Sequence, residues 1–418
     1  MISKNSTAPH DLGGGKIKEK LSYGWLVAAA GCVLILVGAN FQYSFGVFLK
    51  PLIKQFGWSR AAISGSVTLR SIISGVMSPF TGGLSDRYGP KILIFIGILF
   101  VGAGYLLAAR LEHLWQLYVY LSIFVGIGMG LFYTPVVGTV TKWFGAKSAF
   151  PNGILLSGFG LSQIIVPPVA THLIIRYGWA TCFAVLGLTT LVVGLAAWSF
   201  VRLPAQPGAL KSGDDRAVAE RARTLSMALH SPAFWIIFAV YFIVALCYQM
   251  VAIHVVAAAM DEGISAAAAA LILTFAGITN TIGRLTMGSL AGRIGNKNTF
   301  LICLAIQTPM LFILSRAHSL YVFYLVALVY GMFYAGISPL IPTLSASLFG
   351  TASVGVTFGI LNLGYTAGIS IGPFVGGFVF DLTGHYASAF LSASVIMALT
   401  FLSCLALKLP EEGSRTAR

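Results

Sequence analysis

Apolar runs of about 20 residues, separated by short polar breaks, constrain this chain more than any other feature of its sequence. A run of that length crosses the hydrocarbon core of a bilayer as an α-helix. Only 9% of the 418 residues are charged, whereas a soluble domain has about a quarter. We therefore expect an all-α membrane protein with twelve spans, at residues 24–49, 58–84, 92–109, 114–139, 149–174, 179–201, 233–256, 265–290, 299–314, 320–348, 354–380 and 386–407.

The distribution of positive charge predicts how the chain lies in the membrane. If the N-terminus is cytoplasmic, eighteen Lys and Arg residues fall on that side and six on the other, which is the positive-inside bias. Both termini are then cytoplasmic, and the net charge of +14 needs no nucleic acid as a partner. We expect a bacterial inner-membrane protein made of a tail (1–22), a six-helix bundle (23–202), a cytoplasmic linker (203–232), a second bundle (233–408) and a tail (409–418).

The sequence indicates neither an enzyme active site nor a metal site. All five cysteines fall within expected spans at no metal-ligand spacing, and we interpret them as small buried side chains. The spans contain no pair of His, Asp or Glu side chains suited to catalysis. No cofactor and no metal ion are therefore expected.

Arg284 lies inside the expected span 265–290, with Asn280 one helical turn before it. An ionised side chain at membrane depth is a functional candidate unless it reaches the lipid surface. On one helix face, the guanidinium and the amide form a site for a carboxylate. The alternative is that Arg284 lies near the helix end and extends to the headgroups.

A second arginine, Arg70, also lies within a span, whereas no Asp or Glu lies deep in any span. Two buried cations without a buried anion favour an anionic ligand. Arg70 is a second anion contact, an outer gate residue, or a group bonded to helix-end carbonyls.

The polar end of the first span, with Gln42 and Tyr43, either borders a cavity or bonds neighbouring helices.

Two pairs of segments repeat at an offset of 206 residues. The loop around Arg87 recurs around Arg293, and Gly153, Pro167 and Gly178 have counterparts at the same offset, Gly359, Pro373 and Gly384. One period at two independent places predicts two pseudo-symmetric six-helix halves. Transporters with such repeats bind their substrate near the midplane, between the halves.

The first of these loops has a specific sequence, Gly82-Gly83-Leu84-Ser85-Asp86-Arg87-Tyr88-Gly89-Pro90-Lys91, and it follows the second span. It resembles the loop signature of the major facilitator superfamily. The resemblance makes Gly83, Asp86, Arg87 and Arg293 candidates for a conformational gate. The second loop has Gly292 where the first has Asp86, so it cannot repeat the charge contact of that carboxylate.

Further motifs narrow the resemblance to the oxalate/formate antiporter and monocarboxylate porter branch. They are Tyr23-Gly24-Trp25, Gln42-Tyr43-Ser44-Phe45-Gly46-Val47-Phe48, Phe56-Gly57-Trp58-Ser59-Arg60-Ala61, Tyr133-Thr134-Pro135 and Trp143-Phe144. The branch implies alternating access, carboxylate substrates and a carboxylate-binding arginine at position 284. Animal porters tend to have an aspartate where this chain has Asn280. The oxalate type has a lysine in the stretch that here begins at Tyr365, so a singly charged anion is expected.

The resemblance also implies aromatic walls around a small acid, from Tyr120, Tyr330 and Tyr334; as bare sequence features, such tyrosines equally suit packing. Tyr365 is a further candidate for substrate binding. We expect a proton-coupled secondary transporter of small monocarboxylates such as lactate or pyruvate, with the anion, a proton and membrane lipid as partners. One alternative is an antiporter of oxalate, formate or other organic acids. Another is a drug exporter of the same fold, although that function usually needs a buried acid.

Overall fold

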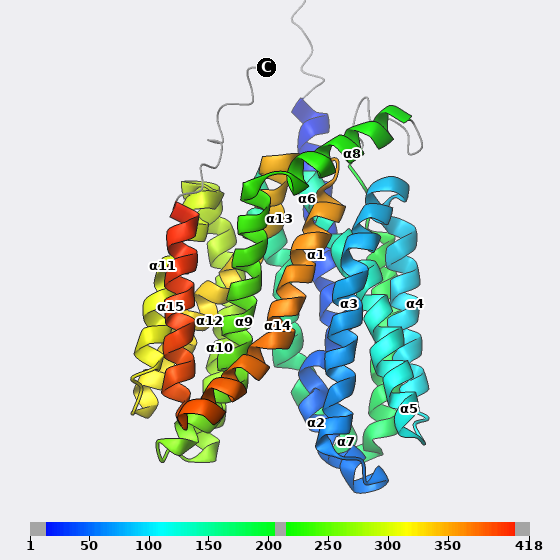
Figure 1. The fold of residues 1–418 in the computed structure, drawn as a ribbon. Coiled ribbons are helices and arrows are strands. Elements are labelled where there is room, and N and C mark those ends of the chain that lie inside the picture. The colour runs from blue at the N-terminus through cyan, green and yellow to red at the C-terminus, as the bar shows by residue number, and fades with distance from the viewer. Residues whose placement is uncertain (1–13, 205–214, 406–418) are drawn as a thin grey trace, which may run out of the picture.

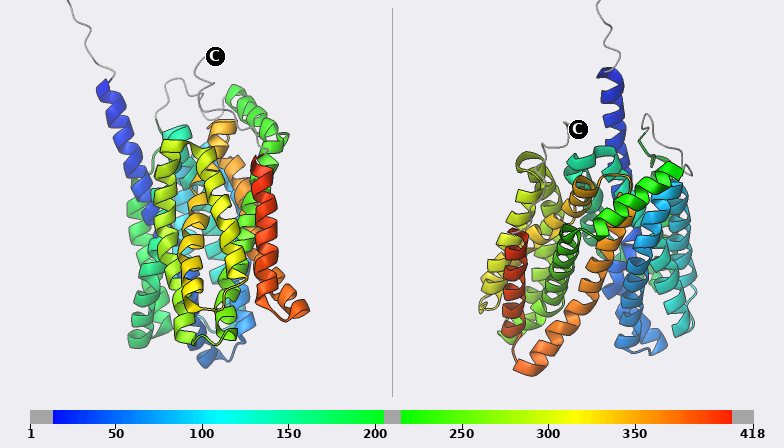
Figure 2. Two further views of the ribbon diagram at one scale, coloured as in Figure 1. Left: turned by 90° about the vertical axis from the view of Figure 1, so that its left-hand side faces the viewer. Right: turned by 45° about the horizontal axis from the view of Figure 1, so that its top comes forward.

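The computed structural model describes residues 14–204 and 215–405, and within these ranges it contains helices and no strands (Figure 1). The long helices run roughly parallel to one axis. The first of them, α1, begins at the end of the bundle where the linker helix α8 lies, and α15 ends there (Figures 1 and 2). We call this the α8 end.

The first half of the chain forms nine elements. They are α1 (Gly14–Gly38), α2 (Asn40–Phe56), α3 (Arg60–Tyr88), α4 (Pro90–Ala108), α5 (Leu114–Leu117), the π-helical turn η1 (Tyr118–Phe124), α6 (Val125–Phe144), the 3₁₀ turn η2 (Gly145–Lys147) and α7 (Ala149–Ser199). Gly178 interrupts α7 with a left-handed backbone (φ 84°, ψ 164°) that favours glycine. One continuous element therefore contains two of the expected spans.

The second half follows α8 (Asp215–Leu229). Its elements are α9 (Pro232–Asp261), α10 (Ala266–Ile294), α11 (Asn296–Leu314), α12 (Leu320–Ile337), α13 (Leu340–Phe349), α14 (Val354–Thr383) and α15 (Tyr386–Leu405). Eight helical segments of the described chain are long and apolar enough to cross a membrane. Helices α3 and α10, which contain Arg70 and Arg284, are not among these eight. Helix α7 counts as one segment although it contains two of the expected spans.

The two halves repeat each other at the offset that the sequence predicts. Helices α3 and α10 have 29 residues each and begin 206 positions apart, and so do the 19-residue helices α4 and α11. Local contacts repeat too. Tyr118 donates its hydroxyl hydrogen to the carbonyl of Ala62 (2.7 Å), and Tyr324 does the same with Ala268 (2.9 Å).

The halves meet where α3 packs on α14 and α7 packs on α10. Glycine permits the closest approaches: a Cβ atom added at Gly153 of α7 would collide with the carbonyl oxygen of Arg284 on α10. The pseudo-symmetric counterpart is Gly359 of α14, where a Cβ would collide with the carbonyl oxygen of Ser78 on α3. The internal repeat therefore also organises the contact between the halves.

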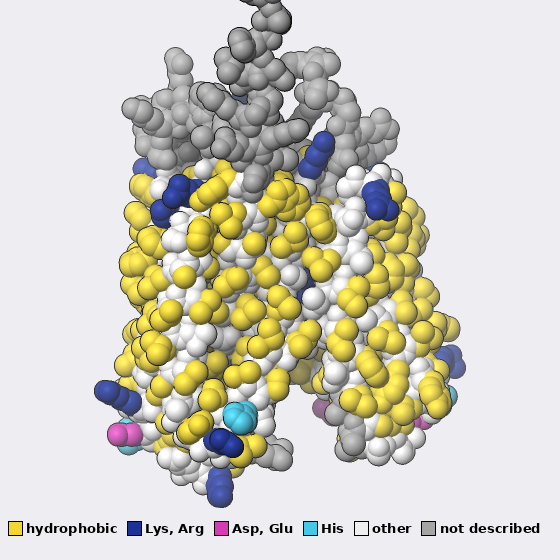
Figure 3. Space-filling view, turned by 180° about the vertical axis from the view of Figure 1, so that it is seen from behind, with side chains coloured by type: hydrophobic (Ala, Val, Ile, Leu, Met, Phe, Trp, Pro, Cys, Tyr) yellow, Lys and Arg dark blue, Asp and Glu magenta, His cyan; other side chains and the backbone are white. Residues whose placement is uncertain are grey.

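At the α8 end, Asp86 joins the halves. Its carboxylate accepts hydrogen bonds from the backbone N–H groups of Gly355 (3.3 Å) and Val356 (3.0 Å), in the first turn of α14, and from the ammonium of Lys142 (2.7 Å). Unpaired N–H groups and the helix dipole favour an anion at that place. At the opposite end, the surface is hollowed between the halves (Figure 3).

The other residues of the predicted gate make fewer contacts. Arg87 is exposed and lies over the ring of Tyr88 in its own helix, at 5.1 Å. Arg293 is also exposed, and Gly292 has open space around it. Gly83 lies close enough to Val356 for a Cβ to make ordinary van der Waals contact. Asp86 therefore makes the charged contact between the halves in this part of the fold.

Replacing Asp86 by Asn should loosen the α8 end, because the amide loses the charge that faces α14 and leaves Lys142 without its counter-charge. We expect a loss of roughly 1–3 kcal/mol from this closed contact. The measurement is the labelling rate of a cysteine at Thr343, which is buried and hydrogen-bonded to Ser148 across the interface (2.9 Å). Labelling should accelerate in Asp86→Asn and stay unchanged in the exposed control Arg87→Gln. Equal labelling rates in Asp86→Asn and Arg87→Gln would contradict a stabilising contact between the halves at Asp86.

Candidate functional site

Arg284 lies within α10, on the face that turns toward the interior of the molecule. Its side chain is buried, with 8% of the residue exposed. One guanidinium nitrogen, Nη1, donates a long hydrogen bond to the carbonyl of Asn280 (3.4 Å), and Nε has no hydrogen-bond partner among the described residues. No carboxylate forms an ion pair with it in residues 14–204 or 215–405. The lipid-surface alternative for Arg284 therefore does not describe this structure.

The guanidinium borders a small cavity within the second half. Helices α9, α10, α12 and α14 supply its walls, namely Tyr241, Val244, Arg284, Tyr334, Ala335, Ile337, Ser338 and Tyr365. The ring of Phe159, from α7 of the other half, lies 5.9 Å from the guanidinium carbon. The cavity thus combines one positive charge, phenolic hydroxyls and aliphatic surface beside the interface between the halves.

Tyrosines from three helices form a connected cluster around this charge. The hydroxyls of Tyr334 and Tyr365 are hydrogen-bonded at 2.7 Å. The ring of Tyr334 stacks on that of Tyr248, with centroids 3.5 Å apart, and Tyr241 lies against Tyr365 at 4.7 Å. Such contacts fix the rings, so their hydroxyl groups are held in place beside Arg284.

Asn280 connects this cluster to α10. Its Nδ2 donates to the hydroxyl of Tyr248 (2.9 Å), while Oδ1 has no partner in the described part of the chain. The amide and the guanidinium are four residues apart and lie on one face of the helix, as the sequence predicts. The structure therefore brings together Arg284, Asn280, Tyr334 and Tyr365 of the predicted site, while the ring of Tyr330 lies 6.1 Å from that of Tyr248.

Sequence analysis missed two members of the cluster, Tyr241 and Tyr248 of α9. They are seven residues apart, or two helical turns, so they share one face of α9. That spacing was visible in the sequence. It could not show that this face turns toward α10, α12 and α14, because periodicity identifies a face of a helix and does not identify its neighbour.

Three other predicted contacts lie apart from the cavity or outside the described residues. Tyr120 is half-buried in η1 of the first half, where its ring packs near Trp115 (6.4 Å). Arg70 is buried in α3 with 3% exposed, and its Nη2 donates to Ser71 (3.4 Å). The side chain of Tyr43 lies outside the described residues.

The place equivalent to Arg284 in the first half is neutral. It is Ser78, whose hydroxyl is hydrogen-bonded to that of Thr134 and accepts a bond from Nδ2 of Asn362 (3.0 Å). Each of these buried side chains finds a partner in the others. The helices and their contacts therefore repeat, whereas the position of Arg284 has a neutral counterpart, Ser78, in the first half.

Two bundles of membrane helices related by an internal repeat, with a polar cavity beside their interface, define a membrane transporter rather than an enzyme. The sequence model described as Major Facilitator Superfamily matches residues 30–262 and 250–418. The chain belongs to this superfamily.

Individual relatives agree with this assignment. The chain is 24% identical to monocarboxylate transporter 13 of Rattus norvegicus over 397 residues, covering 92% of this chain and 91% of that one. It is 23% identical to the oxalate:formate antiporter of Oxalobacter formigenes over 330 residues, or 78% of each chain. The fold matches the crystal structure of the E. coli fucose:proton symporter FucP with a TM-score of 0.69, at 17% identity and 94% and 98% coverage. The proton:xylose symporter XylE matches with a TM-score of 0.72, at 15% identity and 92% and 95% coverage.

The unpaired guanidinium predicts an unusual stability effect. Burying a charge without a counter-charge costs free energy, so Arg284→Met should stabilise the ligand-free protein by roughly 1–3 kcal/mol. The measurement is thermal unfolding in one detergent without added acids. The exposed Arg316 provides the control, since Arg316→Met should change stability by no more than about 0.5 kcal/mol. A large decrease in the melting temperature of Arg284→Met would mean that Arg284 is a structural residue.

Proposed function

We propose that this protein is a secondary active transporter of small monocarboxylates of the lactate or pyruvate kind. The observation that carries the proposal is the buried guanidinium of Arg284, which borders a cavity and has no ion-pair partner in the described chain. A carboxylate bound there would supply the missing negative charge through directed, charge-assisted hydrogen bonds. The names of the relatives, monocarboxylate transporters and an oxalate:formate antiporter, support an organic anion as substrate.

The neighbouring residues suit a small, singly charged acid. Arg284 would bind the carboxylate, and Asn280 would meet the polar part of the substrate next to it. Tyr334 and Tyr365 would offer hydroxyl groups on the other side of the cavity. Because the cavity has one cation, a dianion would keep an uncompensated charge. The absence of a deeply buried Asp or Glu in the spans argues against the drug-exporter alternative.

Transport would proceed by alternating access. We place the α8 end in the cytoplasm, in the inner membrane of a bacterium, because the positive-inside bias favours this orientation. The closed contact at Asp86 is then the cytoplasmic gate, with Gly83, Arg87 and Arg293 in its loops, and the hollow of Figure 3 faces outward. Neutralisation of Arg284 by the substrate would let the two bundles rock across the contacts of α3 with α14 and of α7 with α10.

We propose a proton as the coupled ion, carried with the substrate. At the position where animal porters tend to have an acid, this chain has Asn280, and the cavity walls contain no Asp, Glu or His. That same lack of a titratable carboxylate favours the second candidate function, exchange of one organic anion for another, which needs no proton. The two modes differ in their driving force.

Substitution of Arg284 tests the site. In proteoliposomes with labelled lactate or pyruvate, Arg284→Ala should reduce the affinity for the acid at least about thirty-fold, because truncating one partner of a buried charge pair costs 2 kcal/mol or more. Arg284→Lys keeps the charge without the planar fork and should lose less. Arg316→Ala is the matched control at the surface. Uptake by Arg284→Ala equal to that of the unmodified protein would end the carboxylate proposal.

The coupling mode can be tested with the same vesicles. Proton symport predicts that an acid pH outside drives accumulation of the labelled acid and that a protonophore abolishes this accumulation. Exchange predicts little uptake into empty vesicles and fast uptake into vesicles preloaded with unlabelled lactate, oxalate or formate. Accumulation that depends on preloading and is insensitive to the protonophore would replace symport by exchange.

A further inference from the structure

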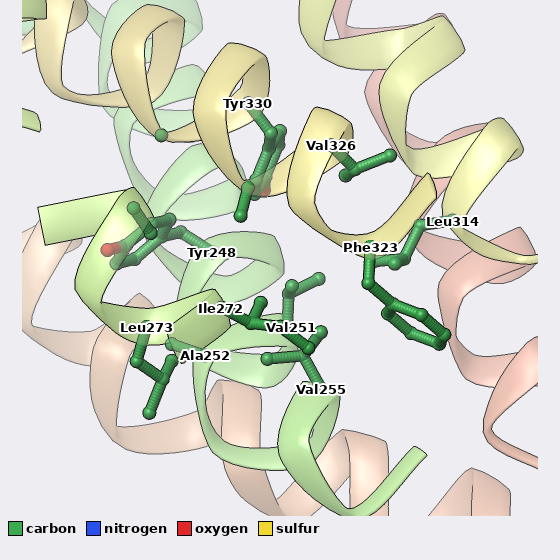
Figure 4. A pocket seen from close by; sticks show the side chains of 13 residues that line it. Tyr248, Val251, Ala252, Val255, Ile272, Leu273, Leu314, Phe323, Val326 and Tyr330 are labelled. Atoms are coloured by element: carbon green, nitrogen blue, oxygen red, sulfur yellow. The ribbon is translucent and has the colours of Figure 1, made fainter. Parts of the chain in front are cut away.

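A second, larger cavity lies in the second half, and Figure 4 shows the side chains that line it. Four helices enclose it, and all its walls are apolar except for two tyrosine hydroxyls. The lining comprises Tyr248, Val251, Ala252, Val255, Ile272, Leu273, Ala276, Leu314, Phe323, Val326, Ala327, Tyr330 and Gly331. A space without charged groups suits hydrocarbon and does not suit a second anion.

The two cavities lie along the same helix faces. On α10, Arg284 borders the first cavity and Ala276 the second, with Asn280 one turn from each. Arg284 and Ala276 are eight residues apart, or about 12 Å along the helix axis. On α12, Tyr334 and Tyr330 are likewise one turn apart and border the first and the second cavity respectively.

One side chain, Tyr248, contacts residues of both cavities. Tyr248 lines the apolar cavity, stacks on Tyr334 of the charged cavity, and accepts the hydrogen bond of Asn280. Opening that one side-chain hydrogen bond and turning the ring of Tyr248 would join the two spaces. A molecule with a charged head and an apolar tail would then find both of its ends accommodated.

One polar atom of the apolar cavity lacks a partner. The hydroxyl of Tyr330, a residue only 2% exposed, makes no hydrogen bond to any described residue. Buried hydroxyl groups are normally paired, so an unpaired one at the wall of a cavity indicates a ligand that completes it. The ligand should therefore be an apolar chain with one hydrogen-bonding atom near Tyr330.

The equivalent positions in the first half carry different residues. By the offset of 206, Ala276 corresponds to Arg70, so the second half has a methyl group where the first half has a long, buried side chain. Tyr330 likewise corresponds to Phe124, which has no hydroxyl. The methyl group of Ala276 and the hydroxyl of Tyr330 therefore have no counterpart at the offset of 206.

We propose that this cavity binds the apolar tail of the transported acid, so that the substrates include monocarboxylates with an aliphatic chain longer than that of lactate. This inference rests on the proposed function, because Arg284 holds the carboxylate head. In this proposal the tail packs against Ala252, Ala276 and Val326, and a polar atom on the tail forms a hydrogen bond with the hydroxyl of Tyr330.

The test is a set of thermal-shift titrations of the full-length protein with acetate, butyrate, hexanoate and octanoate. Burial of each added methylene should tighten the dissociation constant roughly fourfold until the cavity is filled. Ala252→Leu and Ala276→Leu occupy the cavity from two helices and should abolish this gain for hexanoate and octanoate, while acetate binds as before. Ala239→Leu adds the same side chain to the exposed face of α9 and should keep the gain.

The outcomes separate the tail site from the carboxylate site. If all four acids bind the unmodified protein equally and Arg284→Ala abolishes binding, the tail site is overturned and the carboxylate site stands. A chain-length gain that persists in both cavity variants also overturns the tail site. If Arg284→Ala binds acetate as tightly as the unmodified protein does, the proposed function itself fails.

Tyr330→Phe tests the polar atom. It should remove a several-fold preference for 5-hydroxyhexanoate over hexanoate, because the 5-hydroxyl group of the ligand loses the Tyr330 hydroxyl as its hydrogen-bond partner. An unchanged preference would remove Tyr330 from the tail site.

Discussion

The unpaired charge of Arg284 is the interaction on which the site depends. In the low-dielectric interior of a membrane protein, an ion without a counter-ion is costly, and a fold retains one only where something else offsets the cost. Here Nη1 finds one long hydrogen bond, and Nε finds none among the described residues. Helix packing holds the charge next to a cavity, so a negative ligand gains the stabilisation that the ligand-free protein lacks.

The internal repeat relates the helices and the interface contacts of the two halves, but it does not extend to the charge at Arg284. Equal helix lengths, serine caps at Ser59 and Ser265, and the glycine contacts of Gly153 and Gly359 recur at the offset of 206. At the polar centre the copies differ, since Ser78 is fully paired where Arg284 is not. The interface contacts recur because two equivalent pairs of helices meet there, α3 with α14 and α10 with α7. A substrate site needs only one charge, so the second copy was free to diverge.

The sequence predicted the fold more completely than the site. Hydropathy identifies the helices around Arg284 because it depends on residues close in sequence, and because membrane helices satisfy their backbone hydrogen bonds internally. The repeat then relates the two halves by comparing such segments at a fixed offset. The side-chain environment depends on which faces meet. Tyr330 and Tyr334 were predicted through the family resemblance, whereas Tyr248 was missed, because nothing local indicates that it stacks on Tyr334. Tyr120 illustrates the opposite case, a plausible aromatic residue that packs beside Trp115 in the other half.

One residue connects the charge to the movement of the halves. The side chain of Arg284 borders the cavity, while its carbonyl oxygen is the atom that Gly153 of the other half approaches so closely that no Cβ fits between them. Phe159 of the same α7 also lies against the guanidinium. A ligand that draws the guanidinium toward the tyrosines therefore acts on a side chain whose backbone forms part of the interface. In the proposed alternating access, binding and the movement of α7 against α10 would therefore involve the same turn of helix, so neutralising the charge would act directly on the packing of the halves.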